Sequence, residues 1–332
     1  MISLSYIIPV YNSEIYLERC VKSCMNQGLE ENEYEILLCN DGSTDNSLAI
    51  AKDFSQKYSC VKVYSQKNAG AGMARNLGLR HAQGEYVMFV DSDDYLNAID
   101  FNYFFHIAES KNLDLLRFAF KMYDSEGHYS ICHMSQFNEE QIYTGAEAVV
   151  MDYTIGSACG TLFRRKFLID MGFHFRVDMA HEDCEFMLRL LPQVKRMMVS
   201  SACLYTYCWN EGSTDRDHSP LKVMKSHRSD VVVAKSYLET AQSLPKTNPV
   251  SPYYKKKSNS LMTSFLLSLI RNRYGLSLAD RKQLLEFAKG ENVYPMKRYG
   301  TLSWKTSILQ IFLNQEWMEL LLMRLFGGKS SI

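Results

Sequence analysis

Residues 4–12 read LSYIIPVYN, a short apolar run that ends in polar residues. The same order returns at 34–43 (YEILLCNDGS), 61–68 (VKVYSQKN) and 86–94 (YVMFVDSDD). Short apolar runs closed by turn residues predict buried strands, here at 4–10, 34–40, 61–65 and 86–90. The intervening segments predict helices at 14–27, 45–58 and 71–82. This alternation predicts an α/β fold with a mostly parallel, doubly wound sheet, whose ligand lies beyond the carboxyl ends of the strands.

The remaining chain divides into a mixed part and a helical part. We expect helices at 98–111, 145–152 and 181–191, a hairpin that turns at 124–127, and a strand at 204–209. From residue 220 onward the pattern is almost entirely helical. These changes predict three parts, at 1–97, 98–219 and 220–332.

Composition limits the class of protein. With 332 residues, of which 46% are hydrophobic, the chain can bury a sizeable core. Its 37 basic residues balance 37 acidic ones, which argues against a nucleic-acid partner. The balance hides an asymmetry, because residues 1–215 hold 18 basic and 29 acidic residues whereas 216–332 hold 19 and 8. Such halves suggest separate tasks.

The cysteine spacing and the N-terminal sequence favour a cytoplasmic location. The nine cysteines include no C-x-x-C pair, which predicts reduced thiols. The N-terminus lacks the basic region and cleavage site of a signal peptide, so we interpret it as the first strand. The longest uncharged apolar stretch, 261–270, has about half the length that a membrane crossing needs.

The acidic run after the fourth strand is the first candidate site. Asp91 and Asp93 place two hard oxygen ligands at one turn, which suits Mg²⁺ or Mn²⁺ that is also bound by phosphate. A helix N-cap with acidic neighbours is the structural alternative. Three aspartates exceed what a cap needs, so we favour metal or phosphate chemistry.

Two further segments carry candidate residues. Asp41 follows the second strand directly, where a carboxylate can accept from a nucleobase or ribose, although an Asx turn is the alternative. The glycine-rich stretch 68–76 fails the dinucleotide fingerprint because Arg75 stands at the third glycine position. Gly70 and Gly72 instead suggest close approach of a helix start to a ligand. Arg75 would lie near a phosphate or pair with the aspartates.

Acidic residues also open the predicted helix at 181–191. Glu182 and Asp183 can complement the helix dipole and do nothing more. Because this helix follows the sheet, one of the two carboxylates could also face the site as a general base.

Seven segments in this order resemble the family 2 glycosyltransferases, which have the GT-A fold of nucleotide-diphospho-sugar transferases. They cover roughly residues 3–215. Each segment alone is a weak signal, but seven in register are specific. The segments are IIPVYNSEIYLERCVKSCMNQ, EILLCNDGSTDNS, NAGAGMARNLGL, GEYVMFVDSDDYL, GTLFRRKFLIDMGFHF, HEDCEFMLRLL and YTYCWNEGSTDR.

The resemblance implies a role for each matching residue. Asp183 matches the catalytic base, with Glu182 its neighbour that orients the acceptor. Asp93 is the expected direct metal ligand, and Asp91 lies nearer the ribose and shares the metal. The implied donor-binding residues are Pro9, Tyr11, Asn12, Asp41, Asn68, Arg75, Asp91, Ser92, Ser213 and Thr214.

The chain departs from the family pattern at the late loop. Many members carry an arginine shortly before Gly-Ser, where this chain has Cys208-Trp209-Asn210-Glu211. A basic phosphate clamp is therefore not expected at that position. Arg216 or His218, the latter also a candidate metal ligand, are the alternatives.

The resemblance implies an inverting, metal-dependent enzyme that uses Mn²⁺ or Mg²⁺. It would move a sugar from a nucleotide-diphospho-sugar, with UDP favoured, to a hydroxyl of a saccharide or lipid-linked saccharide acceptor in polysaccharide biosynthesis. Residues 1–97 would bind the donor, 98–219 would supply the acceptor region and the base, and 220–332 would form a helical domain. A sugar nucleotidyltransferase and a non-catalytic nucleotide- or carbohydrate-binding module are the alternatives.

The basic segment 216–332 has no recognisable catalytic motif. Its helices would pack on the catalytic domain or on a second subunit, as in a homodimer. Alternatively, its basic and aromatic side chains would hold the enzyme peripherally against an anionic inner membrane leaflet, where a lipid-linked acceptor would lie.

Overall fold

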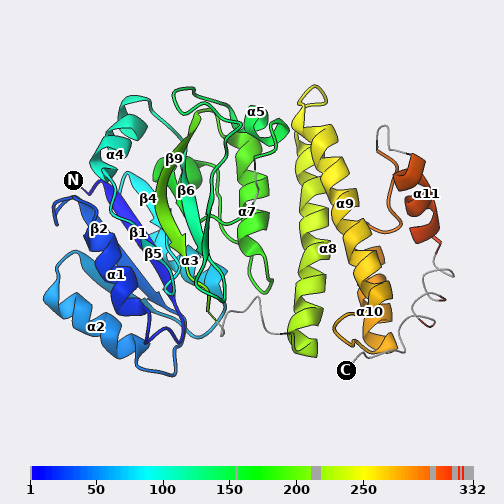
Figure 1. Cartoon of the computed structure of the whole chain (residues 1–332), viewed down its shortest axis with the longest axis horizontal. Helices are drawn as coiled ribbons and strands as arrows, with labels where there is room; N and C mark the ends of the chain where they lie inside the picture. The colour runs from blue at the N-terminus through cyan, green and yellow to red at the C-terminus, as the bar shows by residue number, and fades with distance from the viewer. Residues whose placement is uncertain are drawn as a thin grey trace. The chain divides into compact units, whose positions relative to one another are not determined.

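The computed structural model describes residues 2–153, 156–210, 218–299, 304–315, 321 and 324. The chain forms two compact units. The first consists of Met1–Asp178 with Glu182–Glu211, and the second of Met179–His181 with Gly212–Ile332. The first unit holds the sheet and the second holds long helices (Figure 1). The predicted α/β class is confirmed.

Four parallel strands form the first half of the sheet. They are β1 (Leu4–Val10), β2 (Tyr34–Asn40), β3 (Val61–Ser65) and β4 (Tyr86–Phe89), in the order β3-β2-β1-β4. The chain runs outward from β1 to β3 and then returns to β4. The strand order therefore reverses between β1 and β4, which is where doubly wound sheets bind ligands. Three of these strands have the predicted bounds, and β4 ends one residue earlier than predicted.

The connecting helices cover both faces of this half. They are α1 (Leu17–Met25), α2 (Ser47–Lys57) and α3 (Ala71–His81). α3 packs closely on the sheet, because a Cβ on Gly78 would lie 2.3 Å from Ile7 Cγ2 and 3.0 Å from Cys39 Sγ. Since α1 and α2 belong to crossovers that run in the opposite direction from α3, they lie on the other face. Helix α1 starts three residues later than predicted, after a turn in which Leu17 N–H donates to Ser13 O.

The second half of the sheet is mostly antiparallel. β4 pairs with β8 (Thr161–Arg164), and β8 pairs with β6 (Leu115–Tyr123). β6 runs parallel to β9 (Met197–Tyr207), which also pairs with β5 (Tyr95–Leu96). The predicted hairpin is confirmed by β7 (Tyr129–Cys132), which pairs with β6. Because two antiparallel pairings relate β6 to β4, these two strands run in the same direction, and the hairpin turn lies at the carboxyl end of the first strands.

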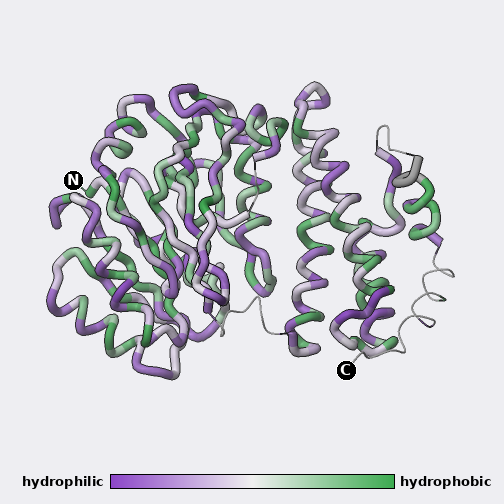
Figure 2. The backbone as a smooth tube through the Cα atoms, viewed as in Figure 1, coloured by the Kyte–Doolittle hydropathy of each residue, from purple (hydrophilic) through white to green (hydrophobic). Residues whose placement is uncertain are grey.

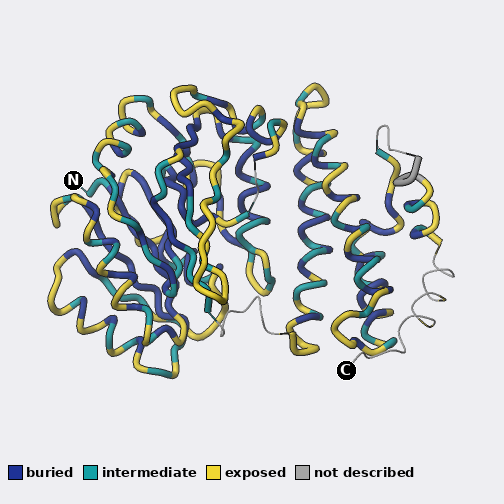
Figure 3. Tube along the Cα trace, viewed as in Figure 1, coloured by how far each residue is buried: buried dark blue, intermediate teal, exposed yellow. Residues whose placement is uncertain are grey.

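Shorter helices complete the first unit. They are α4 (Phe101–Ser110), α5 (Gly145–Val150), α6 (Arg165–Asp170), α7 (Glu182–Leu190) and the 3₁₀ turn η1 (Leu191–Gln193). The predicted helices at 98–111, 145–152 and 181–191 are thus present with shifted ends. The strand expected at 204–209 is β9, which begins seven residues earlier. Burial is continuous through β1, β2 and β4 (Figure 3).

The second unit is built from α8 (Pro220–Ser243), α9 (Val250–Arg271), α10 (Leu278–Gly290) and α11 (Trp304–Leu313). α8 begins at the predicted proline, which suits the first helical position. Hydrophobic and hydrophilic residues are interspersed along α8 and α9 (Figure 2). The apolar side chains form a core around Phe265, Leu266 and Leu284. Among the described helices, none combines the length and the apolar character of a membrane-spanning segment.

The close packing of α3 gives a first prediction. Gly78→Ala places a methyl group against Ile7, so we expect the free energy of unfolding to fall by about 1–3 kcal/mol. Urea unfolding followed by far-UV circular dichroism measures the change. Arg80→Ala, an exposed position on the same helix, is the control and should stay within about 0.5 kcal/mol of wild type. Equal free energies for Gly78→Ala and wild type would contradict the packing.

Candidate active site

The loops after β1, β2 and β4 are joined by short hydrogen bonds. The Ser13 and Ser92 hydroxyl oxygens lie 2.6 Å apart, and Asp41 N–H donates to Val10 O at 2.8 Å. Asn12 Oδ1 accepts from Thr44 N–H at 2.8 Å. The sequence therefore brings its polar motifs to one edge of the sheet, as the topology requires.

Asp41 organises the loop that leads into α3. Its buried carboxylate accepts from Gln66 Nε2 at 2.8 Å, Ala69 N–H at 2.9 Å and Gly70 N–H at 2.8 Å. The Asx role at the start of α2 belongs instead to Asp45, whose Oδ1 accepts from Ser47 N–H. The contact of Asp41 with a base or ribose stays a prediction.

The other residues expected at the nucleotide lie at the same strand ends. Pro9 is buried in β1 opposite Cys39. Tyr11 is 50% exposed, so its ring is free to stack on a planar ligand. Asn12 is exposed in the left-handed region at φ 49°, and Asn68 is exposed on the loop before α3.

Arg75 on α3 connects the two halves of the first unit. Its guanidinium, with the side chain only 4% exposed, donates through Nη2 to Asp91 Oδ1 and through Nη1 to Glu182 Oε1, both at 2.7 Å. Nη1 also lies 2.9 Å from Asp183 Oδ1. Burial opposes the charged form, but the charges of the three carboxylates prevail and raise the pKa of Arg75 well above its ordinary value.

Gly72 allows a close approach to the protein itself, whereas the sequence suggested a close approach to a ligand. A Cβ there would lie 2.8 Å from Arg176 O and 3.3 Å from Glu182 Cγ. The close approach is thus to the protein backbone before α7. Asn76 fixes the same segment, because its side chain exchanges two hydrogen bonds of 2.8 Å with the backbone of Phe175.

The three aspartates after β4 differ in environment. Asp93 Oδ2 accepts from Asn210 Nδ2 at 3.3 Å, and burial together with the charge of Asp91 raises the pKa of Asp93. Asp94 is 1% exposed and accepts from the Tyr205 hydroxyl at 2.6 Å and from Cys208 N–H at 2.8 Å. Burial, with the charges of Asp91 and Asp93, raises the pKa of Asp94 to about 8.

The helix-cap alternative for this run is wrong. Strand β5 follows the aspartates directly, and the next helix, α4, is capped by Asp100, whose side chain accepts from Tyr103 N–H. The run forms a turn in which Asp94 N–H donates to Asp91 O at 3.1 Å. Asp91 and Asp93 are therefore not required as caps.

Asp183 at the start of α7 has one oxygen fixed by hydrogen bonds and one paired with Arg75. Oδ2 accepts from Ser157 Oγ at 2.9 Å and from Ala158 N–H at 3.1 Å. In the described part of the chain, the buried Oδ1 accepts no hydrogen bond, although it lies near Arg75. Burial raises the pKa of Asp183 to about 6; Glu182 and Asp91 add to the rise, and the Arg75 guanidinium opposes it.

Sequence reasoning missed three residues that support these groups. Arg117 on β6 is buried and donates to Ser157 O and Cys159 O, which fixes the loop that holds Asp183. Tyr205 binds Asp94 and accepts from Asp91 N–H at 3.2 Å. Arg19 on α1 donates to Asp93 O at 2.6 Å. No local motif marks them, because each reaches the site across a long sequence separation.

The predicted late loop is described only in part. Ser213, Thr214 and Arg216 lie outside the described residues. His218 is described within the second unit, where its ring stacks on Tyr274 with centroids 4.6 Å apart. The roles suggested for these positions stay predictions.

A metal would have two aspartates as its protein ligands. Among the described residues, no three His, Cys, Asp or Glu side chains converge as a ready metal site. The oxygen donors of Asp91 and Asp93 nevertheless fit Mg²⁺ or Mn²⁺, which are commonly held by one or two carboxylates together with substrate phosphates. The site thus has the chemistry for a metal that arrives with an anionic ligand.

The fold and the site define the class of protein. A doubly wound parallel half, an antiparallel extension and carboxylates after β4 together make a GT-A fold. The model of the family Glycosyl transferase family 2 matches residues 5–172, just over half of the chain. The chain belongs to this family.

Curated relatives match the chain over part of their length. An uncharacterized glycosyltransferase, EpsJ of Bacillus subtilis, is 30% identical over 219 residues, which are 63% of this chain and 62% of that protein. The poly(ribitol-phosphate) beta-glucosyltransferase of Bacillus spizizenii is 31% identical over 209 residues, 61% of this chain and 32% of that protein. The chain thus spans less than two thirds of either relative.

Solved structures share the fold. TarS 1-349 of S. aureus in complex with UDP-GlcNAc matches with a TM-score of 0.58 and 20% identity, over 95% of this chain and 91% of that one. The mannosyltransferase PcManGT of Pyrobaculum calidifontis in complex with GDP-Man and Mn2+ matches with a TM-score of 0.52 and 14% identity, over 98% and 88%.

The buried guanidinium gives the second prediction. Arg75→Met leaves three neighbouring carboxylates without their cation, so we expect the free energy of unfolding to fall by about 3 kcal/mol. The guanidinium lowers the pKa of Asp183, so without it that pKa rises further, and protonation of Asp183 then relieves part of the repulsion. The loss should therefore be smaller at pH 5.5 than at pH 8.

Urea unfolding at both pH values measures this difference. Arg80→Met on the exposed face of α3 is the matched control and should change little at either pH. A loss for Arg75→Met that is equal at both pH values would argue against the carboxylate cluster as its cause.

Proposed function

We propose that this family 2 glycosyltransferase is an inverting, metal-dependent enzyme. It would transfer a sugar from a nucleotide-diphospho-sugar, with UDP favoured, to a hydroxyl of a saccharide or lipid-linked saccharide. The observation that carries the proposal is the Arg75 guanidinium, which holds Asp91 beside Glu182 and Asp183. Asp91, which would hold the metal at the donor, and Asp183, which would act on the acceptor, are thereby kept in one site.

The base in this proposal is Asp183. Its Oδ2 is fixed by Ser157 and Ala158. Oδ1 lies 2.9 Å from Arg75 Nη1 and accepts no hydrogen bond in the described part of the chain, so it would take the proton of the acceptor hydroxyl as that hydroxyl attacks the anomeric carbon. A pKa of about 6 leaves the group ionised at neutral pH and basic enough to accept a proton. Attack from the face opposite the leaving nucleoside diphosphate inverts the configuration.

Donor binding would use the edge formed by β1, β2 and β4. The exposed ring of Tyr11 would stack on the base, while Asp41 keeps the loop before α3 in place. Asp91 and Asp93 would hold Mn²⁺ or Mg²⁺. When bound, the metal would offset negative charge on the departing diphosphate. The UDP-GlcNAc of TarS and the GDP-Man and Mn2+ of PcManGT support this donor class.

Replacement of Asp183 tests the base. Asp183→Asn should lower the turnover of transfer by about 10²–10⁴-fold, since it removes the proton acceptor but not the donor contacts. Wild-type turnover should rise with pH through about 6 and then level, because the carboxylate form is lost below its pKa, and the residual rate of Asp183→Asn should lack this step. Steady-state rates between pH 5 and 8 measure both, with the surface variant Asp170→Asn as the control.

A Kd for the donor that stays within about threefold of wild type would confine the Asp183→Asn defect to the chemical step. Unchanged turnover in this variant would contradict the assignment of Asp183 as the base.

A donor screen tests the class of reaction. Wild type incubated with Mn²⁺ and UDP-, GDP- and dTDP-sugars should release a nucleoside diphosphate, and EDTA should abolish the release. Asp93→Asn should weaken metal-dependent donor binding, because it removes a hard oxygen ligand. Release of pyrophosphate from a nucleoside triphosphate and a sugar phosphate would identify a nucleotidyltransferase instead. Binding without any release would indicate a non-catalytic module.

The basic second unit could contact either a membrane or a second subunit in this proposal. Its excess of basic residues, with exposed Ile308, Ile311 and Phe312 on α11, supports peripheral contact with an anionic membrane at its cytoplasmic face. The same surface also supports contact with a second subunit. Salt-dependent sedimentation with anionic liposomes separates the two.

A further inference from the structure

An exposed group of side chains lies on the β6–β7 hairpin next to the candidate site. Tyr129 is 58% exposed and Ile131 52%, which is unusual for large side chains in a sheet. Tyr123 and Lys121 stand beside them on β6. With Tyr95 on β5, these five residues are called the hairpin platform here.

Strand register places the five side chains on one face of the sheet. Thr206 of β9 pairs with both Tyr95 and Lys121, and Lys121 pairs with Ile131. Residues directly opposite each other in neighbouring strands point to the same face, as do residues two apart in one strand. Tyr123, which pairs with Tyr129, therefore joins the same face.

Direct contacts hold the platform together. The Tyr123 and Tyr129 ring centroids are 5.9 Å apart, and Lys121 Nζ lies 3.8 Å from the Tyr129 centroid and 4.9 Å from that of Tyr123. The rings are thus ordered before any ligand arrives, which lowers the entropic cost of binding.

The platform is continuous with the candidate site through Arg19. The Arg19 guanidinium lies 4.8 Å from the Tyr95 ring centroid and donates to Asp93 O. The hairpin turn also lies at the carboxyl end of the first strands. A molecule seated on the platform therefore extends along the sheet toward the aspartates, on the side of β9.

We propose that the hairpin platform is an acceptor subsite that binds a neutral pyranose ring. The inference rests on the proposed function and names the acceptor class for it. Tyrosine rings present flat apolar faces that pack on the C–H face of a sugar ring, while their hydroxyl groups can bond to sugar hydroxyls.

Charge on the hairpin favours a neutral ligand. The Lys121 ammonium already lies over the two tyrosine rings, where cation–π attraction engages it. The turn itself carries Asp124 and Glu126, which repel a phosphate. A ring sugar therefore fits the platform better than a polyol-phosphate chain does.

The same charges disfavour a second copy of the chain as the occupant. β7 has four residues and adjoins an acidic turn, and short edge strands with charged flanks resist pairing with another sheet edge. The exposed apolar side chains are also few for a stable dimer.

Binding by the full-length protein tests the subsite. Saturation-transfer difference NMR titrations would use cellobiose, lactose, N,N′-diacetylchitobiose and, as the polyol-phosphate probe, ribitol 5-phosphate. Wild type should bind at least one disaccharide. Tyr129→Ala should weaken that Kd about 3- to 10-fold, because it removes the stacking ring, whereas Tyr129→Phe keeps the ring and should stay within twofold.

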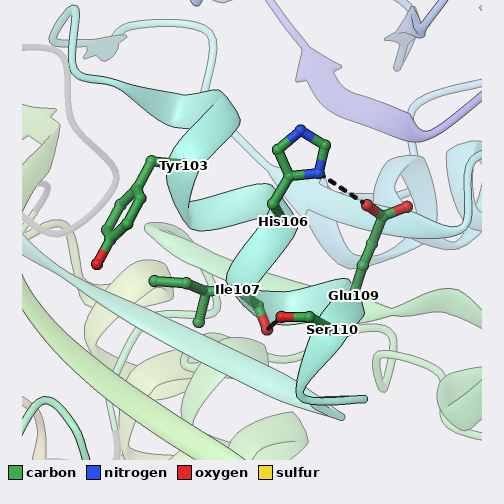
Figure 4. Close-up of a pocket in the computed structure, with 5 residues that line it drawn as sticks. All are labelled: Tyr103, His106, Ile107, Glu109 and Ser110. Atoms are coloured by element: carbon green, nitrogen blue, oxygen red, sulfur yellow. Dashed lines mark hydrogen bonds and ion pairs between the residues drawn. The ribbon is translucent and has the colours of Figure 1, made fainter.

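Tyr103→Ala is the matched control. Tyr103 has the same 58% exposure but lies on α4, where it lines an open hollow of about 550 Å³ with His106, Ile107, Glu109 and Ser110 (Figure 4). This variant should bind like wild type. Ile131→Ala provides a second platform variant, and thermal unfolding checks that each variant is folded.

Several outcomes would overturn the inference. They are no binding of any disaccharide by wild type, equal Kd values for wild type, Tyr129→Ala and Ile131→Ala, or loss of ribitol 5-phosphate binding alone. A wild-type dimer that Tyr129→Ala dissociates in sedimentation velocity would assign the face to a second copy. Nucleoside diphosphate release without an acceptor reports on the proposed function separately, so failure of the subsite and failure of the enzyme assignment are distinguishable.

Discussion

The site depends on one buried cation. The Arg75 guanidinium lies in the interior of the first unit, where an unpaired charge would be strongly destabilising. It therefore has to be met by carboxylates, and they come from two distant places in the chain, the turn after β4 and the start of α7. The parallel half and the antiparallel half of the fold are thus joined at the point where donor and acceptor chemistry would meet.

Residues of α3 around Arg75 are shaped by this constraint. Gly72, Arg75 and Asn76 are three and four apart, so they share one helix face, and each contacts the segment that leads into α7. Gly72 makes room for the Arg176 carbonyl, and Asn76 pairs with the Phe175 backbone. Stacking of Phe175 on Phe186, with centroids 4.2 Å apart, packs α7 against this segment. The position of Asp183 is therefore a consequence of packing as well as of charge.

Local sequence patterns predicted those strands whose bounds depend on neighbouring residues alone. The first three strands have their predicted bounds, because each is a short apolar run closed by turn residues. Strand β8 was not predicted, because its four residues are defined by partners on β4 and β6 rather than by any periodicity.

The same limit applies to the residues of the candidate site. Asp93 and Asp94 are adjacent and chemically alike, and it is the long-range contacts with Tyr205 and Cys208 that hold Asp94 inward. Arg117 and Arg19 carry no motif, because their partners are distant in sequence.

The charge of the described site bears on the need for a metal. Asp91, Asp93, Glu182 and Asp183 lie around the two guanidinium groups of Arg75 and Arg19. Even with Asp94 protonated at neutral pH, as its raised pKa indicates, these four carboxylates outnumber the cations. A nucleoside diphosphate brings further negative charge, which this edge of the sheet would repel. Asp91 and Asp93 would hold a divalent cation, whose positive charge would offset that repulsion. Electrostatics thus supports the proposed metal dependence on grounds separate from the family to which the chain belongs.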